Sequence, residues 1–159
     1  MSPLRQIVGL IVLLAVVFAV AGLGSLATSP NIPTWYAGLA KPSWNPPNWL
    51  FGPVWSVLYV CMATAAWLVW RKGGWAQARR ALSLFALQLA LNGAWSWLFF
   101  GLHRPGAAFV ELVALLAAIL ATTIAFWGRS LAAGILMLPY LGWVAFASVL
   151  NFSIWRLNA

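Results

Sequence analysis

Five stretches of mostly apolar residues follow one another along this chain, and each is about 20 residues long, enough to cross a bilayer as a helix. The stretches lie at about 7–27, 49–70, 81–102, 106–127 and 131–155. Every connection between them is short except that at 28–48. The sequence therefore predicts an all-α fold, in which residues 1–159 form one integral membrane bundle of five transmembrane helices.

The composition agrees with lipid as the main solvent of the chain. Only 6% of the residues are charged, and Glu111 is the single acidic residue, whereas a soluble domain carries about 25% charged residues. The formal net charge of +8 does not indicate a nucleic-acid partner, because the nine Lys and Arg residues are scattered between apolar stretches and form no basic face. We expect membrane lipid as a partner and no nucleic acid.

The distribution of the basic residues predicts the orientation in the membrane. With the N-terminus in the cytoplasm, six basic residues lie on the cytoplasmic side, namely Arg5, Arg71, Lys72, Arg79, Arg80 and Arg129. Three lie on the other side, namely Lys41, Arg104 and Arg156. Because basic residues accumulate in cytoplasmic loops, we expect a cytoplasmic N-terminus and an external 28–48 loop.

The first stretch has an alternative interpretation as a cleaved signal peptide. Arg5 precedes it, and the triplet Ser25-Leu26-Ala27 resembles a cleavage site. The apolar run is longer than the 7–15 residues, roughly, of a signal-peptide core. We therefore expect a retained membrane helix.

The 28–48 loop is rich in proline and aromatic residues, including Pro30, Pro33, Trp35, Tyr36 and Trp44. Proline restricts the backbone, and tryptophan suits the boundary between water and lipid. Pro46-Pro47 then precedes the second stretch, where proline is compatible with the first helical turn. We predict a stiff lid that folds back over the bundle rather than a slack linker.

Polar and aromatic residues share faces on three of the predicted helices. These faces carry Gln88, Asn92, Trp95 and Phe99 on the third helix, Tyr140, Trp143, Ala147 and Asn151 on the fifth, and Trp55 and Tyr59 on the second. The faces could line a mostly apolar cavity for a flat hydrophobic ligand. In the alternative, the polar groups only bridge helices and the rings fill the core.

Other polar and small residues give weaker signals. Ala86, Ala90 and Ala94 form a small-residue stripe that suits close helix packing, either between two subunits or within one bundle. His103 is a candidate haem ligand or a solvated histidine at the end of the third helix. The sequence contains no nucleophile–histidine–acid set, no metal-ligand cluster and no phosphate loop, so no conventional catalytic constellation is predicted.

Several ordered motifs resemble the translocator protein family, also known as tryptophan-rich sensory proteins or peripheral benzodiazepine receptors. The motifs are Trp35-Tyr36, Lys41-Pro42-Ser43-Trp44-Asn45-Pro46-Pro47, Gly52-Pro53-Val54-Trp55, Phe99-Phe100-Gly101, Leu138-Pro139-Tyr140-Leu141-Gly142-Trp143 and Leu150-Asn151-Phe152-Ser153-Ile154-Trp155-Arg156. The resemblance extends from about Trp35 to Asn158.

The resemblance implies a five-helix membrane protein, commonly a homodimer, that binds tetrapyrroles such as protoporphyrin IX and drug-like hydrophobic ligands. It implies pocket positions at Trp55, Tyr59, Asn92, Trp95, Trp143 and Ala147, with the loop around Trp35 as a cover. We add Phe99 and Tyr140, which share faces with these residues. Trp55 and Trp143 match residues implicated in light-dependent porphyrin breakdown, so they are the candidate catalytic residues of a function whose enzymatic nature stays open.

The resemblance also sets the alternatives. The animal sterol motif has a tyrosine where this chain has Phe152, ahead of Arg156, which argues against high sterol affinity. The short tail and the loop charges suit a bacterial cell-membrane protein. We predict a membrane receptor or regulator with porphyrin as ligand and no required cofactor; the alternatives are a transporter of tetrapyrroles or lipids and a light-driven porphyrin-degrading enzyme.

Overall fold

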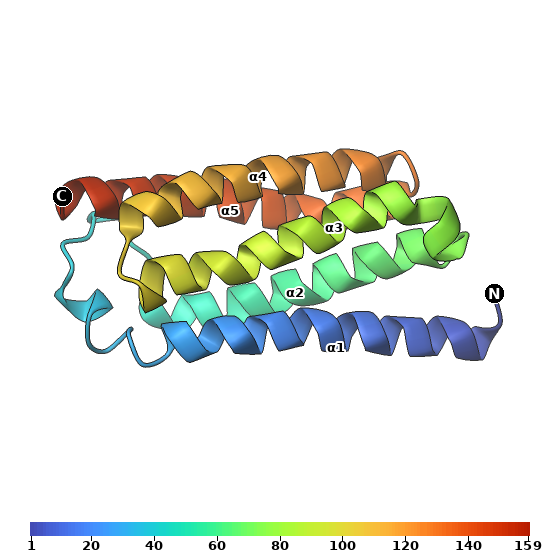
Figure 1. The fold of residues 1–159 in the computed structure, drawn as a ribbon, viewed down its shortest axis with the longest axis horizontal. Coiled ribbons are helices and arrows are strands. Elements are labelled where there is room, and N and C mark those ends of the chain that lie inside the picture. The colour runs from blue at the N-terminus through green and yellow to red at the C-terminus, as the bar shows by residue number, and fades with distance from the viewer.

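The computed structural model describes all residues from 1 to 159 and contains five long helices. The helices are α1 (Pro3–Thr28), α2 (Asn48–Trp70), α3 (Gly74–Ser96), α4 (Pro105–Trp127) and α5 (Leu131–Leu157). They form an elongated bundle with the N-terminus at one end and the C-terminus at the other (Figure 1). All five are long and apolar enough to span a membrane, which confirms the predicted all-α, multi-pass fold.

The helix ends follow local sequence signals. Pro3 and Pro105 occupy first-turn positions, where their missing N–H groups leave no bond unmade. The hydroxyl of Ser130 accepts a hydrogen bond from the N–H of Ala133 and caps α5. The third helix begins at Gly74, earlier than the predicted span, and its last turn, Trp97–Gly101, is a π-helical turn. Such turns often occur at functional sites because they change the direction of side chains.

The helices are arranged as a ring in the order α1, α2, α5, α4 and α3, and each packs against its two neighbours in this order. Helices that follow one another in the chain run in opposite directions, which places the α2–α3 and α4–α5 turns beside the N-terminus (Figure 1). The longest connection, from Ser29 to Pro47, lies at the opposite end of the bundle, together with the α3–α4 turn and the C-terminus. We call these the N-terminal end and the loop end.

The connection between α1 and α2 lies against the loop end of the bundle. It contains a short 3-10 turn, η1 (Tyr36–Gly38). The side chain of Asn158 accepts from the N–H of Ala40 at 3.0 Å and donates to its carbonyl at 2.8 Å. The rings of Trp44 and Phe146 lie 5.8 Å apart. These contacts fasten the loop to α5.

Candidate ligand cavity

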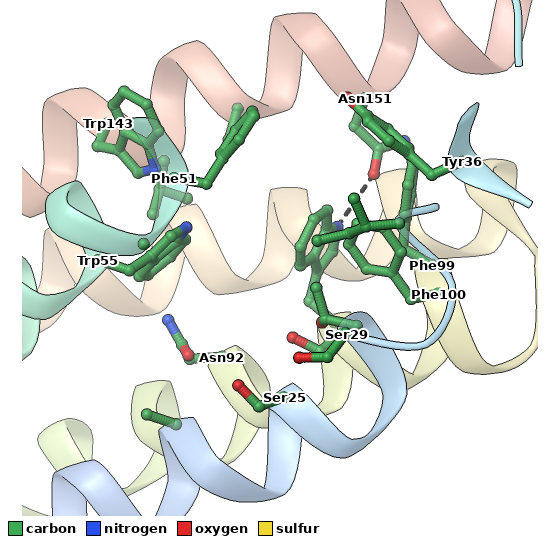
Figure 2. A pocket seen from close by; sticks show the side chains of 18 of the residues that line it. Ser25, Ser29, Tyr36, Phe51, Trp55, Asn92, Phe99, Phe100, Trp143 and Asn151 are labelled. Atoms are coloured by element: carbon green, nitrogen blue, oxygen red, sulfur yellow. Dashed lines mark hydrogen bonds between the residues drawn. The ribbon is translucent and has the colours of Figure 1, made fainter. Parts of the chain in front are cut away.

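A cavity of about 720 Å³ lies inside the loop half of the bundle, and all five helices and the loop contribute to its wall. Seven of the residues that the sequence predicts for a ligand site line it: Trp55, Tyr59, Asn92, Trp95, Phe99, Trp143 and Ala147. Figure 2 shows Trp55, Phe51 and Trp143 gathered on one side and Tyr36, Phe99 and Phe100 on the other. The fold therefore brings residues from α2, α3, its terminal turn and α5 around one space.

A chain of hydrogen bonds forms the floor of the cavity. Tyr59 Oη donates to Asn92 Oδ1, and Asn92 Nδ2 donates to Tyr140 Oη, both at 2.8 Å. Tyr140 Oη in turn donates to Gln88 Oε1 at 2.8 Å. The chain links α2, α3 and α5. It holds the amide of Asn92 in a fixed orientation at the boundary between the cavity and the packed half of the bundle.

Two of the predicted site residues lie outside the cavity wall. Tyr140 is fully buried behind Trp55, with ring centroids 6.2 Å apart, and its hydroxyl faces the polar floor. Trp35 stacks on the imidazole of His103 at 4.3 Å and meets the edge of Phe99 at 5.4 Å. Both residues support groups that line the cavity.

The tryptophans of the wall differ in how they are held. The indole N–H of Trp95 donates to Asn151 Oδ1 at 3.0 Å, and the Asn151 amide donates to the Pro105 carbonyl at 2.8 Å. Trp95 also stacks on Phe99 at 5.2 Å. Trp143 has only ring contacts, with Phe51 at 6.0 Å and with Phe146 at 5.4 Å. Hydrogen bonds thus fix Trp95 to α5 and to the start of α4, whereas the indole N–H groups of Trp55 and Trp143 make no hydrogen bond within the protein.

No charged side chain lines the cavity. Apart from indole N–H groups, its polar groups are neutral amides and hydroxyls, on Ser25, Thr28, Ser29, Tyr36, Asn48, Ser56, Tyr59, Asn92, Ser96 and Asn151. Mostly apolar walls with a few hydrogen-bonding groups are typical of sites for small hydrophobic molecules. The arrangement is suited to ring stacking and edge recognition rather than to acid–base chemistry.

The loop closes the cavity with Tyr36. This side chain is buried against Phe99 and Phe100, and its hydroxyl donates to Asn45 Oδ1 at 3.0 Å. Burial raises the pKa of Tyr36 above its usual range, and the hydrogen bond to Asn45 offsets part of this effect. The loop is therefore held by a neutral phenol at ordinary pH.

His103 fastens the loop from the other side. Its Nε2 lies 2.8 Å from Asn31 Oδ1, and its ring stacks on Trp35. His103 is also the one non-glycine residue with a positive φ, 54°. The left-handed backbone lets the chain turn sharply between α3 and α4 while the imidazole reaches the loop.

Sequence reasoning assigned no site residue to α1, yet α1 forms one wall of the cavity through Phe18, Gly22 and Ser25. Ser25 and Ser29 are visible on this wall in Figure 2. The one signal in the sequence is the helical spacing of small and polar residues at Gly22, Ser25 and Ser29 within an otherwise apolar stretch. The triplet that resembled a cleavage site thus contains a cavity-lining residue.

Two further features lie outside the cavity. Ala86, Ala90 and Ala94 are exposed on the outer face of α3. The carboxyl oxygens of Glu111 are buried without a hydrogen-bond partner, and so is the Nε2 of Gln88.

Comparison with known proteins identifies similar chains along almost the whole length. The sequence profile described as the TspO/MBR family matches residues 11–156. A tryptophan-rich protein TspO of Archaeoglobus fulgidus is 43% identical over 159 residues, which is the full length of both chains. The translocator protein of Homo sapiens is 48% identical over 126 residues, covering 78% of this chain and 75% of the human protein. A tryptophan-rich sensory protein of Cereibacter sphaeroides is 41% identical over 124 residues, covering 78% and 77%.

Proposed function

The chain belongs to the TspO/MBR family, and we propose that it is a membrane receptor or regulator that binds a porphyrin, protoporphyrin IX in the first place, in the cavity beneath the loop. The observation that carries this proposal is a neutral cavity of about 720 Å³ walled by Trp55, Trp95 and Trp143. Its size falls within the range of about 300–1,000 Å³ for small-molecule sites. Other flat hydrophobic molecules, including drug-like ones, fit the same chemistry.

Rings and polar groups in the cavity wall would contribute to ligand binding in different ways. Indole rings stack on an extended macrocycle and contribute dispersion and burial of apolar surface. Asn92 keeps a second N–H and a second lone pair beyond its bonds to Tyr59 and Tyr140, and these can meet the polar edge of a ligand.

The carboxylates of a porphyrin find no cation in the wall and would turn toward the loop end. There the ammonium group of Lys41 lies 4.6 Å from the ring centroid of Tyr36, and Arg104 immediately precedes α4. This orientation leaves the apolar part of the macrocycle within the ring of helices.

A second candidate function is light-dependent porphyrin breakdown, favoured by the presence of both Trp55 and Trp143 in the wall. An excited macrocycle can take one electron from an adjacent indole, so that the indole is oxidised and the porphyrin is reduced. We expect Trp143→Phe to lower the photochemical loss of bound porphyrin more than it lowers binding. Absorbance decay at matched occupancy and illumination measures this; equal decay rates in parent and variant contradict the role. Multiple turnovers without loss of either indole indicate an enzyme.

Transport of tetrapyrroles or lipids is the alternative function for the same cavity. Flux of porphyrin across proteoliposomes that contain the pure protein distinguishes a transporter from a receptor. A receptor binds porphyrin without increasing its flux above that of protein-free vesicles.

We further propose a bacterial cell membrane as the location, with the N-terminus in the cytoplasm, because six of the nine basic residues lie at the N-terminal end of the bundle. We propose a homodimer through the exposed alanine stripe of α3, since small residues permit close helix approach. Cross-linking in native membranes after Ala90→Cys tests the contact, and Gly142→Cys on α5 is the control.

The main test is a titration with protoporphyrin IX that follows quenching of tryptophan fluorescence. We expect saturable quenching with one site per chain, weakened in Asn92→Ala and in Trp143→Phe. Trp127→Phe is the matched control, because Trp127 lies outside the cavity at the far end of α4. Quenching that rises without saturation, equally in all four proteins, indicates partitioning into detergent and contradicts the proposal.

A further inference from the structure

The wall of the cavity between α1 and α2 is built from small residues. Gly22 and Ser25 on α1 and Gly52 and Ser56 on α2 all line the cavity, and all four are exposed. This part of the wall therefore carries little side-chain bulk on either helix. A Cβ added at Gly22 or at Gly52 would meet no atom within 4 Å. The seam between the two helices is therefore open at this level.

The same seam is closed nearer the N-terminal end. The indole N–H of Trp67 donates to the carbonyl of Gln6 at 2.8 Å. Trp70 lies so close to Gly9 that an added Cβ would collide with its ring. Phe18 meets Tyr59, with ring centroids 6.0 Å apart, just below the open part. The opening is thus bounded below by aromatic contacts and does not extend along the whole seam.

We expect the seam at Gly22 and Gly52 to face lipid rather than water. Gly22 precedes the end of α1 at Thr28 by six residues, and Gly52 follows the start of α2 at Asn48 by four. At about 1.5 Å per residue, both glycines lie roughly 6–9 Å inside the helix ends. Both helices are apolar enough to span the membrane, and we infer that this depth lies within the leaflet at the loop end.

The route from water, by contrast, is covered by the loop. Asn158 makes two hydrogen bonds to Ala40, the Trp35 ring stacks on His103, and Tyr36 is buried over the cavity. A ligand that approached from the water would have to release these contacts. A ligand dissolved in the membrane would have to release none of them.

We propose that the α1–α2 seam at Gly22 and Gly52 is a lateral portal, through which a flat, membrane-dissolved ligand enters the cavity directly from the lipid. The proposal rests on the proposed binding function for the identity of the ligand, a porphyrin. The small side chains at the seam leave the passage open. The hydroxyl of Ser25 supplies a polar contact at the threshold for the edge of such a molecule.

The first test measures the kinetics of protoporphyrin IX binding in lipid nanodiscs by stopped-flow tryptophan quenching. A portal is passed in both directions, so a bulky side chain in it slows association and dissociation together. We expect Gly22→Leu and Gly52→Leu combined to lower both rate constants by about tenfold, so that Kd changes much less than either rate. Replacing glycine by leucine favours the helix, and the thermal melting temperature verifies folding.

Two control variants separate passage through the portal from passage beneath the loop and from a general effect of added leucine. Gly142→Leu on α5 adds the same side chain at an exposed helical glycine with open space around it, outside the cavity wall, and we expect unchanged rates. Asn158→Ala loosens the loop and should leave both rates unchanged. Unchanged rates in the Gly22/Gly52 double variant, or faster rates in Asn158→Ala, would show passage beneath the loop and overturn the proposal.

A second test does not depend on porphyrin. Ala147 lines the cavity on α5, so Ala147→Cys in a Cys61→Ser background places one thiol inside it. We expect N-(1-pyrenyl)maleimide dissolved in the bilayer to label this thiol, and the two leucines of the double variant to slow labelling severalfold, unlike Gly142→Leu. If quenching by porphyrin does not saturate but the leucines slow labelling, the result supports the portal and contradicts the porphyrin function. If quenching saturates but the leucines change neither the binding rates nor the labelling rate, the result contradicts the portal alone.

Discussion

The two halves of the bundle use the same five helices but fill the space between them differently. In the N-terminal half, fully buried alanines such as Ala63, Ala66 and Ala78 let the helices approach closely, and Phe85 and Phe126 stack at 5.9 Å between them. In the loop half, Trp55, Trp95 and Trp143 project into the ring from three helices and leave a cavity.

The contrast indicates how an apolar sequence specifies a cavity. Without a strong hydrophobic force between helices in lipid, close packing depends on small residues that allow backbones to approach. Large rings on facing helices keep those backbones apart. The polar chain from Tyr59 to Gln88 lies where one pattern gives way to the other and fixes the boundary.

The largest effect is expected from a substitution in the packed, N-terminal half. Phe126 is fully buried against Phe85, so Phe126→Ala leaves a void that closely packed helices cannot fill. We expect a loss of about 3 kcal/mol or more in the free energy of unfolding, with little effect on the affinity of the residual folded protein.

Phe51→Ala in the cavity wall is the matched variant for this comparison. Phe51 already borders empty space, so its removal costs less stability, but it deprives Trp143 of a ring neighbour and weakens ligand binding. Unfolding in detergent and porphyrin titration measure the two effects. Equal losses of stability in both variants would contradict the difference between the halves.

A smaller effect is expected at the boundary between the halves. Tyr140→Phe removes a hydroxyl that accepts from Asn92 and donates to Gln88, and leaves two buried polar groups without partners. We expect a loss of about 1–3 kcal/mol in stability. Porphyrin affinity should also fall, because Asn92 loses one of the bonds that orient it.

Tyr59→Phe is the control for that prediction. Tyr59 makes a single bond to Asn92 and lines the cavity, so the loss of stability should be smaller than in Tyr140→Phe. Thermal melting of both variants in one detergent makes the comparison. A greater loss in Tyr59→Phe would show that the floor is held from α2 rather than from α5.

The five helices could be predicted from the sequence because apolar stretches of this length are compatible only with lipid as their surroundings. The prediction missed the first turns of α3, because Arg79 and Arg80 end the apolar stretch although the helix continues to Gly74. An apolar stretch marks the part of a helix that can lie in lipid, whereas the backbone can remain helical beyond the hydrocarbon region. The π-helical turn at Trp97–Gly101 left no signal in the periodicity either.

The site could be predicted in part for a related reason. Periodicity indicates which residues share a face, so Trp55, Asn92 and Trp143 could be grouped as candidates. It does not indicate how far apart facing helices lie. Tyr140 shares the face of Trp143 but is directed at Gln88. The small residues of α1 gave only the helical spacing of Gly22, Ser25 and Ser29, because residues without large side chains add little to a pattern of apolar and polar residues.

The smallest expected effect concerns the loop that covers the cavity. Burial raises the pKa of Tyr36 above that of a tyrosine in the unfolded chain, near 10. Its contribution to stability is therefore complete below about pH 10 and is lost as the pH rises through the raised value. We expect the 29–47 segment to show unchanged protection from hydrogen exchange between about pH 8 and 9, after correction for the intrinsic exchange rate, and to loosen above about pH 10.

Tyr36→Phe isolates the phenol in that experiment, since it removes the ionisable group and the bond to Asn45 but keeps the ring. The variant should loosen the loop by about 0.5–1.5 kcal/mol at neutral pH and abolish the alkaline step. The packed half should respond to neither change, because Phe126, which stacks on Phe85, lies beside the α4–α5 turn at the N-terminal end, away from the loop. If the variant loosened at alkaline pH as much as the parent, another group would cause the pH response, and the phenol of Tyr36 would not be responsible for it.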